Sequence, residues 1–348
     1  VKAVVVEPDE LVTRIKADHK IQKKLEEPLA MDFYTTGSDA GKSTTGVNGK
    51  FIFSQVLIKC LLRLKSTQED KEELISLCEK QYEGNSVELN NLREFKENYS
   101  SDNALWWYTR ETFFYKTLNA ALRKEDIHMI FLFRAFISDI RRQLKNCQAK
   151  QLLQVYRGQM ISSDELEILK QSLHQFISIN SFFSTSTNSQ KVHKFFHGSA
   201  DNLRQPVLFE IYADPKMVVL KPFANVSEYS EYPGESEILF TLGSIFRLNS
   251  IEYSNGDKVW IIRMTLCSEN EHDLKRVLTS MEQQLGWGET NLRTLGKILW
   301  DMGKLDLADK YFRRLLGLLP PNDPLLGSLY EDLGKLASQS GHYDISVQ

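Results

Sequence analysis

The strongest constraint on the fold is a change in hydrophobic periodicity near residue 151. From Phe51 to about residue 150, apolar residues recur at intervals of three and four, which predicts amphipathic helices. After Leu152, short apolar or alternating runs bounded by turn residues predict strands. The helical pattern returns after Ser268. We therefore expect an α+β protein in which helical blocks precede and follow a β-rich core.

Seven runs make up the predicted core and favour a mixed or antiparallel β-sandwich. They are residues 152–157, 176–186, 207–213, 217–220, 237–242, 245–253 and 258–267. Ser162 or Ser163 is expected to cap one helix within this region, and Asn188 another that ends near residue 197. In the helical block, Ser66 and Glu69 have the spacing of a capping box.

Length and composition exclude several classes of protein. The chain has 348 residues, 42% of them hydrophobic, so we expect two or three domains with cores of their own. Its 43 Lys and Arg against 46 Asp and Glu give a net charge of −3, which argues against binding nucleic acid or a membrane surface. Four scattered cysteines without a CxxC pair fit neither a disulfide scaffold nor a zinc ribbon. No apolar run approaches the ~18 residues of a membrane span.

These observations predict four segments. Residues 1–50 are expected to be a remnant of an upstream domain and a linker, and the beginning at Val1 suggests a longer natural chain. Gly37 and Gly41 enclose three residues, whereas a phosphate-binding P-loop needs four, so the Gly- and Ser-rich stretch is interpreted as linker. Residues 51–150 form the helical subdomain and 151–269 the β-rich core. Residues 270–348 form a linker helix and a repeat.

The C-terminal segment contains two copies of one spacing pattern. Small and aromatic residues follow a Leu-Gly pair at fixed intervals: Leu295, Gly296, Ala308, Phe312 and Pro320. A second copy begins at Gly334, 38 residues after Gly296, against ~34 in ordinary tetratricopeptide repeats. The pattern resembles tetratricopeptide hairpins, in which small residues let two helices touch. The resemblance implies a groove that binds a protein partner.

Two polar motifs interrupt the predicted strands. Arg157 and Gly158 end the first strand, where a guanidinium can bind phosphate and a glycine permits close backbone approach. Ser184, Thr185 and Ser186 lie in the second run, and alternation places the two serines on one face. Taken alone, the arginine could be a surface charge, and the serines could belong to a polar edge strand.

A third motif places two carboxylates after a Pro-Gly turn. If the backbone is extended here, Glu235 and Glu237 share one face at the start of an apolar strand. Like charges side by side repel each other, and such pairs are typical of functional sites.

Other catalytic motifs are missing from the sequence. His193 and His197 are four residues apart, but Lys194 occupies the place of the glutamate in HExxH, so no metal site is predicted. There is no GxSxG elbow, and the glycines near Gly286 do not match a dinucleotide-binding fingerprint.

Taken together, the arginine, the Ser-Thr-Ser triplet and the Glu-x-Glu pair resemble the R-S-E pattern of arginine-specific mono-ADP-ribosyltransferases. The resemblance extends from about Phe51 to Cys267, and the helical stretch 107–111, Trp-Tyr-Thr-Arg-Glu, supports it. It implies transfer of ADP-ribose from NAD⁺, the co-substrate, to an arginine of an acceptor protein with release of nicotinamide.

The resemblance also implies roles for individual residues. Glu237 would stabilise the oxocarbenium-like ribose, Arg157 would bind the pyrophosphate, and Ser184 would fix the ribose and orient the glutamate. Glu235 would orient the acceptor arginine and take its proton.

Further residues are expected to line the same NAD⁺ site. Gly158, Thr185 and Ser186 belong to the motifs themselves, and either Phe195 or Phe196 would cover the nicotinamide. A packed helix end is an equal alternative for the two phenylalanines.

Two other functions remain open on sequence alone. Water could intercept the same ribose, which would make the protein an NAD glycohydrolase, or the transferase domain could be inactive and the protein a tetratricopeptide adaptor. Because the cysteines do not align with the disulfides of the secreted enzymes, which also lack such repeats, a cytoplasmic location is expected.

Overall fold

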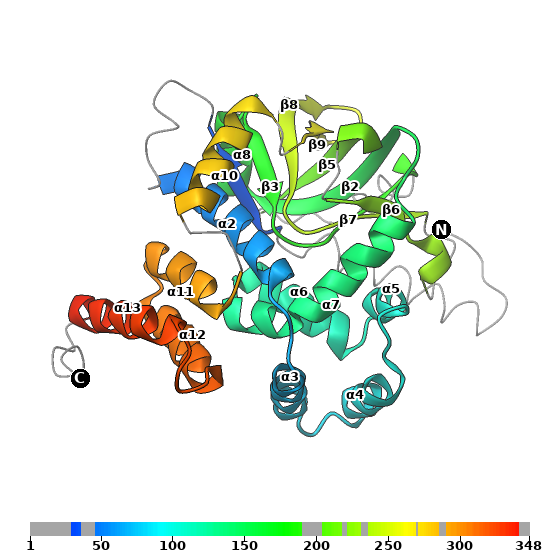
Figure 1. The fold of residues 1–348 in the computed structure, drawn as a ribbon. Coiled ribbons are helices and arrows are strands. Elements are labelled where there is room, and N and C mark those ends of the chain that lie inside the picture. The colour runs from blue at the N-terminus through cyan, green and yellow to red at the C-terminus, as the bar shows by residue number, and fades with distance from the viewer. Residues whose placement is uncertain are drawn as a thin grey trace. The chain divides into compact units, whose positions relative to one another are not determined.

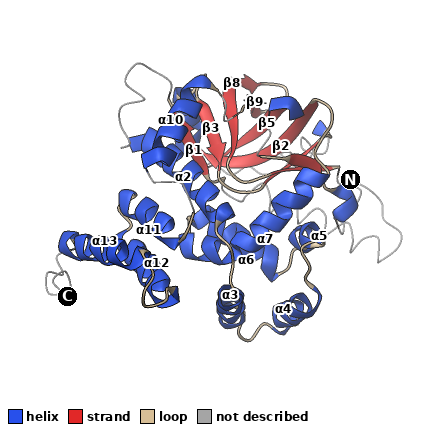
Figure 2. Cartoon of the chain, viewed as in Figure 1, coloured by secondary structure: helices blue, strands red, loops and turns tan. Residues whose placement is uncertain are grey.

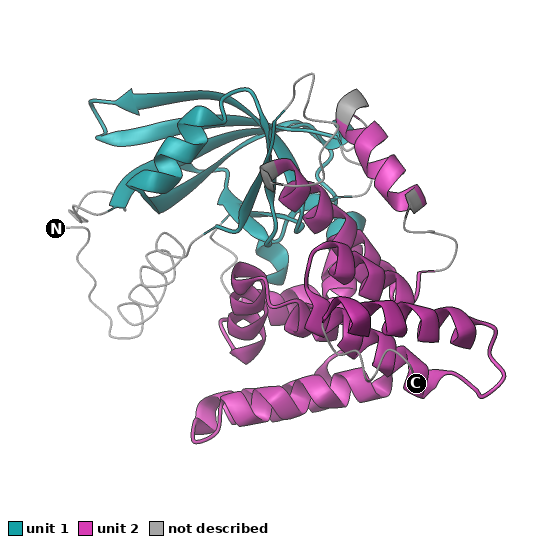
Figure 3. Cartoon of the chain, turned by 90° about the vertical axis from the view of Figure 1, so that its left-hand side faces the viewer, with its two compact units in different colours: residues 1–36, 143–268 teal, residues 37–142, 269–348 magenta. Residues whose placement is uncertain are grey.

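The computed structural model describes residues 29–35, 46–189, 204–217, 221–230, 236–268, 271–284 and 290–340 (Figure 1). Figure 2 distinguishes the helices from the strands. Two compact units emerge: residues 1–36 with 143–268, and residues 37–142 with 269–348 (Figure 3). None of the helices in the described ranges is long and apolar enough to cross a membrane.

The first unit is built on a sheet of nine strands within the described residues. They are β1 (Met31–Tyr34), β2 (Leu153–Ser162), β3 (Phe176–Ile179), β4 (Phe183–Ser186), β5 (Arg204–Ala213), β6 (Phe223–Asn225), β7 (Glu237–Phe240), β8 (Ser244–Ser254) and β9 (Val259–Leu266). The order is β1-β3-β8-β9-β5-β2-β4-β7-β6, and β5 with β9 is the parallel pair among these strands. Helix α8 (Ser163–Gln171) follows β2.

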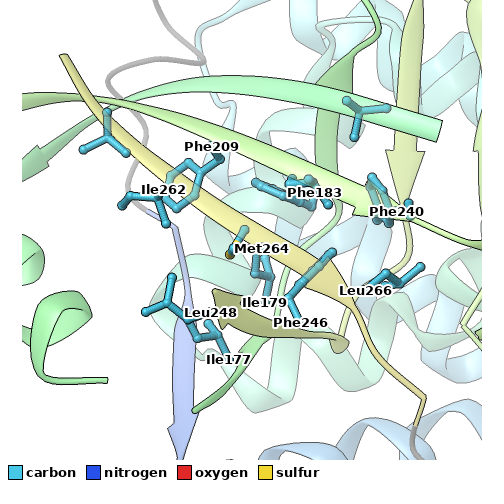
Figure 4. Close-up of a cluster of buried hydrophobic side chains, with 14 of the residues drawn as sticks. Ile177, Ile179, Phe183, Phe209, Phe240, Phe246, Leu248, Ile262, Met264 and Leu266 are labelled. Carbon is cyan, nitrogen blue, oxygen red and sulfur yellow. The ribbon is translucent and has the colours of Figure 1, made fainter. Parts of the chain in front are cut away.

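The sheet curls so that its two halves enclose one core. Strands β4 and β8 are four places apart in the order, which would be roughly 19 Å on a flat sheet. Yet the rings of Phe183 and Phe246 are 6.0 Å apart, and those of Phe240 and Phe246 are 5.6 Å apart. These rings lie in one buried cluster (Figure 4). The α+β class with a mixed, mainly antiparallel β-core is therefore confirmed, and one continuous sheet forms both layers.

Several strand boundaries differ from the prediction. The run 176–186 is divided into β3 and β4, which pair with β8 and β7 in different parts of the sheet. Asn180 lies between them, and its N–H donates to the carbonyl of Ala30. Strand β6 was not predicted. Met217, the first residue of the expected strand 217–220, belongs to a short 3₁₀ helix, η1 (Pro215–Met217), and residues 218–220 lie outside the described ones.

The assignment of residues 1–50 to a remnant and linker is corrected in part. Residues 31–34 are strand β1, which pairs with β3 and buries Asp32 and Tyr34. Helix α2 begins at Gly46, before the predicted boundary at residue 51. The remaining residues of this segment lie outside the described ones.

The second unit is helical and is formed by the two segments that precede and follow most of the β-rich core in the sequence. Its helices are α2 (Gly46–Arg63), α3 (Gln68–Gln81), α4 (Ser86–Asn98), α5 (Ala104–Thr109), α6 (Phe113–Lys124), most of α7 (Ile127–Asn146), α10 (His272–Gln284), α11 (Leu292–Asp301), α12 (Leu305–Leu318) and α13 (Leu325–Gln339). In α6, Phe114, Leu118, Ala121 and Leu122 are buried on one face, as a 3.6-residue period requires.

Helix α3 begins one residue later than its predicted cap implies. Thr67 and Asp70 form the capping box, in place of Ser66 and Glu69. Asp70 is only 1% exposed and also forms an ion pair with the buried Arg134 of α7, so the carboxylate serves both the cap and the core. For α8, the two alternatives resolve to Ser162, which forms a capping box with Glu165.

The C-terminal helices pack closely against each other and against α2. A Cβ added at Gly296 of α11 would lie 2.3 Å from a ring carbon of Phe312 in α12. The glycine therefore allows the two helices to approach, as the spacing pattern predicts for a small residue at this position.

Candidate active site

Arg157 occupies a row of strand β2 that otherwise faces the core. Val155 and Ile161 of the same row belong to the buried cluster, whereas Arg157 is half-buried. Its guanidinium lies over the ring of Phe183, 5.2 Å from the centroid, and Nη1 donates to the backbone carbonyl of Ser184 at 2.9 Å. Strands β2 and β4 pair through Tyr156 and Ser186, so the strand that carries Arg157 is adjacent to the strand that carries the Ser-Thr-Ser triplet.

Ser184 and Glu237 are joined side chain to side chain across β4 and β7. Ser186 is the cross-strand partner of Glu237, so period-two alternation places Ser184 on the same face as the glutamate. The Ser184 hydroxyl donates to Oε1 of Glu237, whose side chain is 6% exposed. A carboxylate that accepts such a bond has a fixed orientation at the start of an apolar strand.

The backbone of Glu237 forms hydrogen bonds with a short segment that precedes strand β7 in the sequence. Its N–H donates to the hydroxyl of Ser227 at 3.0 Å, and its carbonyl accepts from the N–H of Val226 at 2.9 Å. Ser227 begins the 3₁₀ helix η2 (Ser227–Tyr229). Sequence analysis did not identify Ser227 as a site residue, because it lies ten residues before Glu237 and outside the three polar motifs of the predicted site. A serine in a turn gave no signal that could have found it.

The predicted extension from Glu235 to Glu237 is not observed. Ser236 has φ of 51°, a left-handed conformation, and strand β7 begins only at Glu237. The shared-face argument for the two carboxylates therefore fails, because left-handed backbone breaks the alternation of an extended strand. Glu235 itself lies outside the described residues.

Two residues of the triplet and Gly158 occupy different surroundings. Thr185 is 5% exposed, faces away from Ser184 and donates through its hydroxyl to the carbonyl of Ile238 at 2.9 Å. Its hydroxyl therefore joins β4 to β7, and its expected contact with NAD⁺ stays a prediction. Ser186 lies on the glutamate's face, and its hydroxyl accepts from the N–H of Asn188. Gly158 is buried opposite Leu208 on β5.

The remaining predicted residues cannot be placed in the site. Phe195 and Phe196, proposed to cover the nicotinamide, lie outside the described residues, as do His193 and His197. Among the described residues, no cluster of His, Cys, Asp or Glu is arranged to hold a metal ion.

All four cysteines are free thiols. Burial raises the pKa of Cys60 and of Cys78 to about 12. Both thiols are therefore protonated at neutral pH and poor nucleophiles.

Hydrogen bonds thus connect an arginine, a serine and a glutamate that lie on the neighbouring strands β2, β4 and β7. A guanidinium can bind a diphosphate, a hydroxyl can bond a sugar, and an oriented carboxylate can stabilise positive charge on that sugar. This donor set fits a dinucleotide whose pyrophosphate joins two riboses.

A comparison with protein-family models gives a match over residues 78–269, more than half of the chain, to the family described as ADP-ribosyltransferase exoenzyme. The chain belongs to this family. It is accordingly an NAD⁺-dependent mono-ADP-ribosyltransferase, with NAD⁺ as co-substrate and protein as acceptor.

Solved structures of ADP-ribosyltransferases are similar to part of this chain. The transferase HopU1 of Pseudomonas syringae pv. Tomato is 16% identical with a TM-score of 0.40, and the match covers 59% of this chain and 99% of HopU1. For the toxin Plx2a of Paenibacillus larvae, identity is 20% and the TM-score 0.37, with coverage of 57% and 97%. For the Vis toxin of Vibrio splendidus, identity is 18% and the TM-score 0.35, with coverage of 60% and 89%. No curated protein matches.

One site residue of this family member was present in a quoted motif but was not recognised. Gln159, two residues after Arg157, is completely buried, and its side-chain oxygen accepts from Nε and Nη2 of the arginine. The signal was available in period-two geometry, which places residues 157 and 159 on one face. A glutamine in a strand is common enough that spacing alone did not distinguish it.

Proposed function

We propose that this transferase modifies arginine side chains of an acceptor protein, and that Arg157, Ser184, Glu235 and Glu237 carry the reaction. The observation that carries the proposal is the hydrogen bond from the Ser184 hydroxyl to the Glu237 carboxylate, next to the anchored guanidinium of Arg157. The Glu-x-Glu sequence supports the choice of acceptor.

Arg157 binds the pyrophosphate of NAD⁺ in this proposal. Its guanidinium is permanently charged and is held at Nη1 by the carbonyl of Ser184. A charge fixed in this way binds a diphosphate without first losing the freedom of a long side chain.

Glu237 acts on the ribose attached to nicotinamide. The bond between the anomeric carbon and the ring nitrogen breaks, and its electron pair leaves with nicotinamide, which becomes neutral. The Glu237 carboxylate stabilises the positive charge that develops on the ribose. Ser184 keeps this carboxylate oriented through the bond to Oε1.

Glu235 serves the acceptor. A guanidinium remains protonated up to a pH above about 12 and is a poor nucleophile in that form. The Glu235 carboxylate takes a proton from the acceptor nitrogen as that nitrogen bonds to the anomeric carbon. Ser236, between the two glutamates, has a left-handed backbone that ends strict alternation, and this supports different partners for Glu235 and Glu237.

We propose also that helices α11, α12 and α13 form tetratricopeptide-type hairpins that bind a protein partner. The close approach at Gly296 and the repeated spacing at Gly334 support this assignment.

NAD⁺ labelled in its adenylate portion, incubated with agmatine as a small guanidine acceptor, tests the choice of acceptor. Wild type should transfer label to agmatine. Glu235→Gln should lose this transfer by about a hundredfold, as expected for loss of a general base, while free ADP-ribose still forms. Glu228→Gln is the matched control, because Glu228 is exposed on η2, and it should transfer label normally.

Three results would contradict the proposal. Unchanged agmatine modification by Glu235→Gln would remove this residue from the acceptor role. Free ADP-ribose as the only wild-type product would indicate a glycohydrolase. Failure of wild type to consume NAD⁺ would indicate an inactive adaptor.

A further inference from the structure

Gln159 is a fully buried amide attached to the proposed phosphate-binding arginine. Its Oε1 accepts from Nε of Arg157 at 3.2 Å and from Nη2 at 3.0 Å, and its side chain is 0% exposed. One oxygen therefore bonds one edge of the guanidinium twice.

The position of Gln159 in strand β2 buries its amide among apolar residues, which costs folding free energy unless the amide is hydrogen-bonded. Its row runs from Val155 through Arg157 and Gln159 to Ile161, and both ends of the row belong to the hydrophobic cluster. Burial of an amide costs free energy that hydrogen bonds must offset. An aliphatic residue would complete the cluster without this cost. The pair of bonds to Arg157 distinguishes Gln159 from such a residue.

Two neutral acceptors in the described part of the chain hold Arg157 from different sides. Gln159 engages Nε and Nη2, and the Ser184 carbonyl engages Nη1. An arginine side chain loses considerable rotamer freedom when it binds a ligand, so one that is already held loses less. Both acceptors are neutral. As neutral groups they orient the guanidinium without neutralising its charge, whereas a carboxylate in place of the Gln159 amide would neutralise it.

We propose that Gln159 is a positioning residue that pre-orients Arg157 for the pyrophosphate of NAD⁺ without cancelling its charge. This inference rests on the proposed function only in assigning the pyrophosphate to Arg157, and it does not depend on the acceptor being arginine.

A double-mutant cycle measured by calorimetry with ADP-ribose tests it. ADP-ribose retains the pyrophosphate and cannot lose nicotinamide, so binding is separated from turnover. Arg157→Lys and Gln159→Leu should each raise the Kd about tenfold, equivalent to ~1.4 kcal/mol. Because Gln159 acts through Arg157, the double variant should bind no more than about threefold more weakly than Arg157→Lys alone.

A matched control and an isosteric variant complete the experiment. Gln154→Leu changes another glutamine of β2, one that donates to the hydroxyl of Tyr212, and should bind like wild type. Gln159→Glu keeps the volume and the acceptor oxygen and should also raise the Kd by about tenfold, because its charge offsets that of Arg157. This variant carries the test if Gln159→Leu does not fold.

The outcomes separate the two claims. If Arg157→Lys binds ADP-ribose as wild type does, the proposed phosphate site is wrong and the inference falls with it. If Arg157→Lys weakens binding but Gln159→Leu and Gln159→Glu do not, the site stands and the positioning role is overturned. Independent effects that multiply to about a hundredfold in the double variant would likewise overturn it, since Gln159 would then not act through Arg157.

Discussion

Glu237 owes its orientation to two serines, each of which holds a different part of it. Ser184 donates to the carboxylate, and the hydroxyl of Ser227 accepts from the backbone N–H. The first contact was expected from the family resemblance, which implied that Ser184 orients the glutamate; alternation placed Ser184 and Ser186 on one face but did not give the pairing of β4 with β7. The second was not, because Ser227 belongs to a turn whose approach to β7 only the folded chain shows. Gln159 was missed for a different reason: alternation places it on the face of Arg157, but a glutamine in a strand is too common for spacing alone to distinguish it.

His128 is a half-buried histidine of the helical unit whose titration should affect stability. Its ring contacts Glu73, Tyr311 and Lys310, and the guanidinium of Arg314 lies nearby and bonds Glu73. Burial, followed by repulsion from Lys310, lowers the pKa of His128 below 6.5 despite the opposing effect of Glu73. The folded protein therefore binds this proton less readily than the unfolded chain.

The sign of the pH effect follows from this difference. Above pH 6.5 the ring is neutral in both states, and the stability it contributes is complete. As the pH falls below 6.5, the unfolded chain takes up the proton first, so the free energy of unfolding should fall by up to about 1.4 kcal/mol per pH unit. Urea unfolding between pH 5 and 7 should show a smaller dependence of the free energy of unfolding on pH for His128→Gln than for wild type. Equal slopes for wild type and His128→Gln would be inconsistent with this account.

At the scale of elements, most helices and strands followed from periodicity, but the short strands β1 and β6 did not. Strand β1 has four residues next to a Gly- and Ser-rich stretch, and β6 has three, so both are too short to be recognised in the sequence by alternation alone. Both are defined by their partners, β3 and β7. The division of 176–186 into two strands likewise depends on pairing in different parts of the sheet.

The contact of α11 with α12 depends on the absence of a side chain at Gly296. A Cβ there would lie within 2.3 to 2.9 Å of three ring atoms of Phe312, which is itself 0% exposed and cannot move freely. Gly296→Ala should lower the free energy of unfolding by about 1–3 kcal/mol, the usual cost of overpacking. Urea unfolding followed by circular dichroism measures the change.

Gly317→Ala in α12 is the control, because no atom lies within 4 Å of the added Cβ. Alanine is the better helix former, so this change should raise stability by up to about 1 kcal/mol. Gly296→Ala and Gly317→Ala of equal stability would show that the helices are not in close contact.

At the scale of the molecule, segments that are far apart in the sequence belong to the same compact unit. Sequence analysis placed the two helical blocks in separate segments, yet residues 37–142 and 269–348 form one compact unit. The connection is made by charges far apart in sequence. Arg314 of α12 bonds Asp70 and Glu73 of α3, and Asp70 also bonds Arg134. Local patterns contain no information on such pairs.

Arg314 should therefore stabilise α3 from the other end of the chain. Arg314→Met leaves the buried Asp70 with one partner fewer and should speed amide exchange in α3 by about tenfold, since loss of a partly buried partner costs on the order of 1–2 kcal/mol. Arg313→Met removes an exposed pair with Asp309 and should leave exchange unchanged. Equal protection of α3 in the two variants would mean that the C-terminal helices do not support it.

The central claim is that Glu237 is the carboxylate that drives cleavage of NAD⁺, and nicotinamide release tests it most directly. Wild type should release nicotinamide. Glu237→Ala, shown to be folded by its thermal transition, should release it at least about a hundredfold more slowly, and the exposed Glu228→Ala should match wild type. A folded Glu237→Ala that releases nicotinamide within about tenfold of the wild-type rate would contradict the proposed active site.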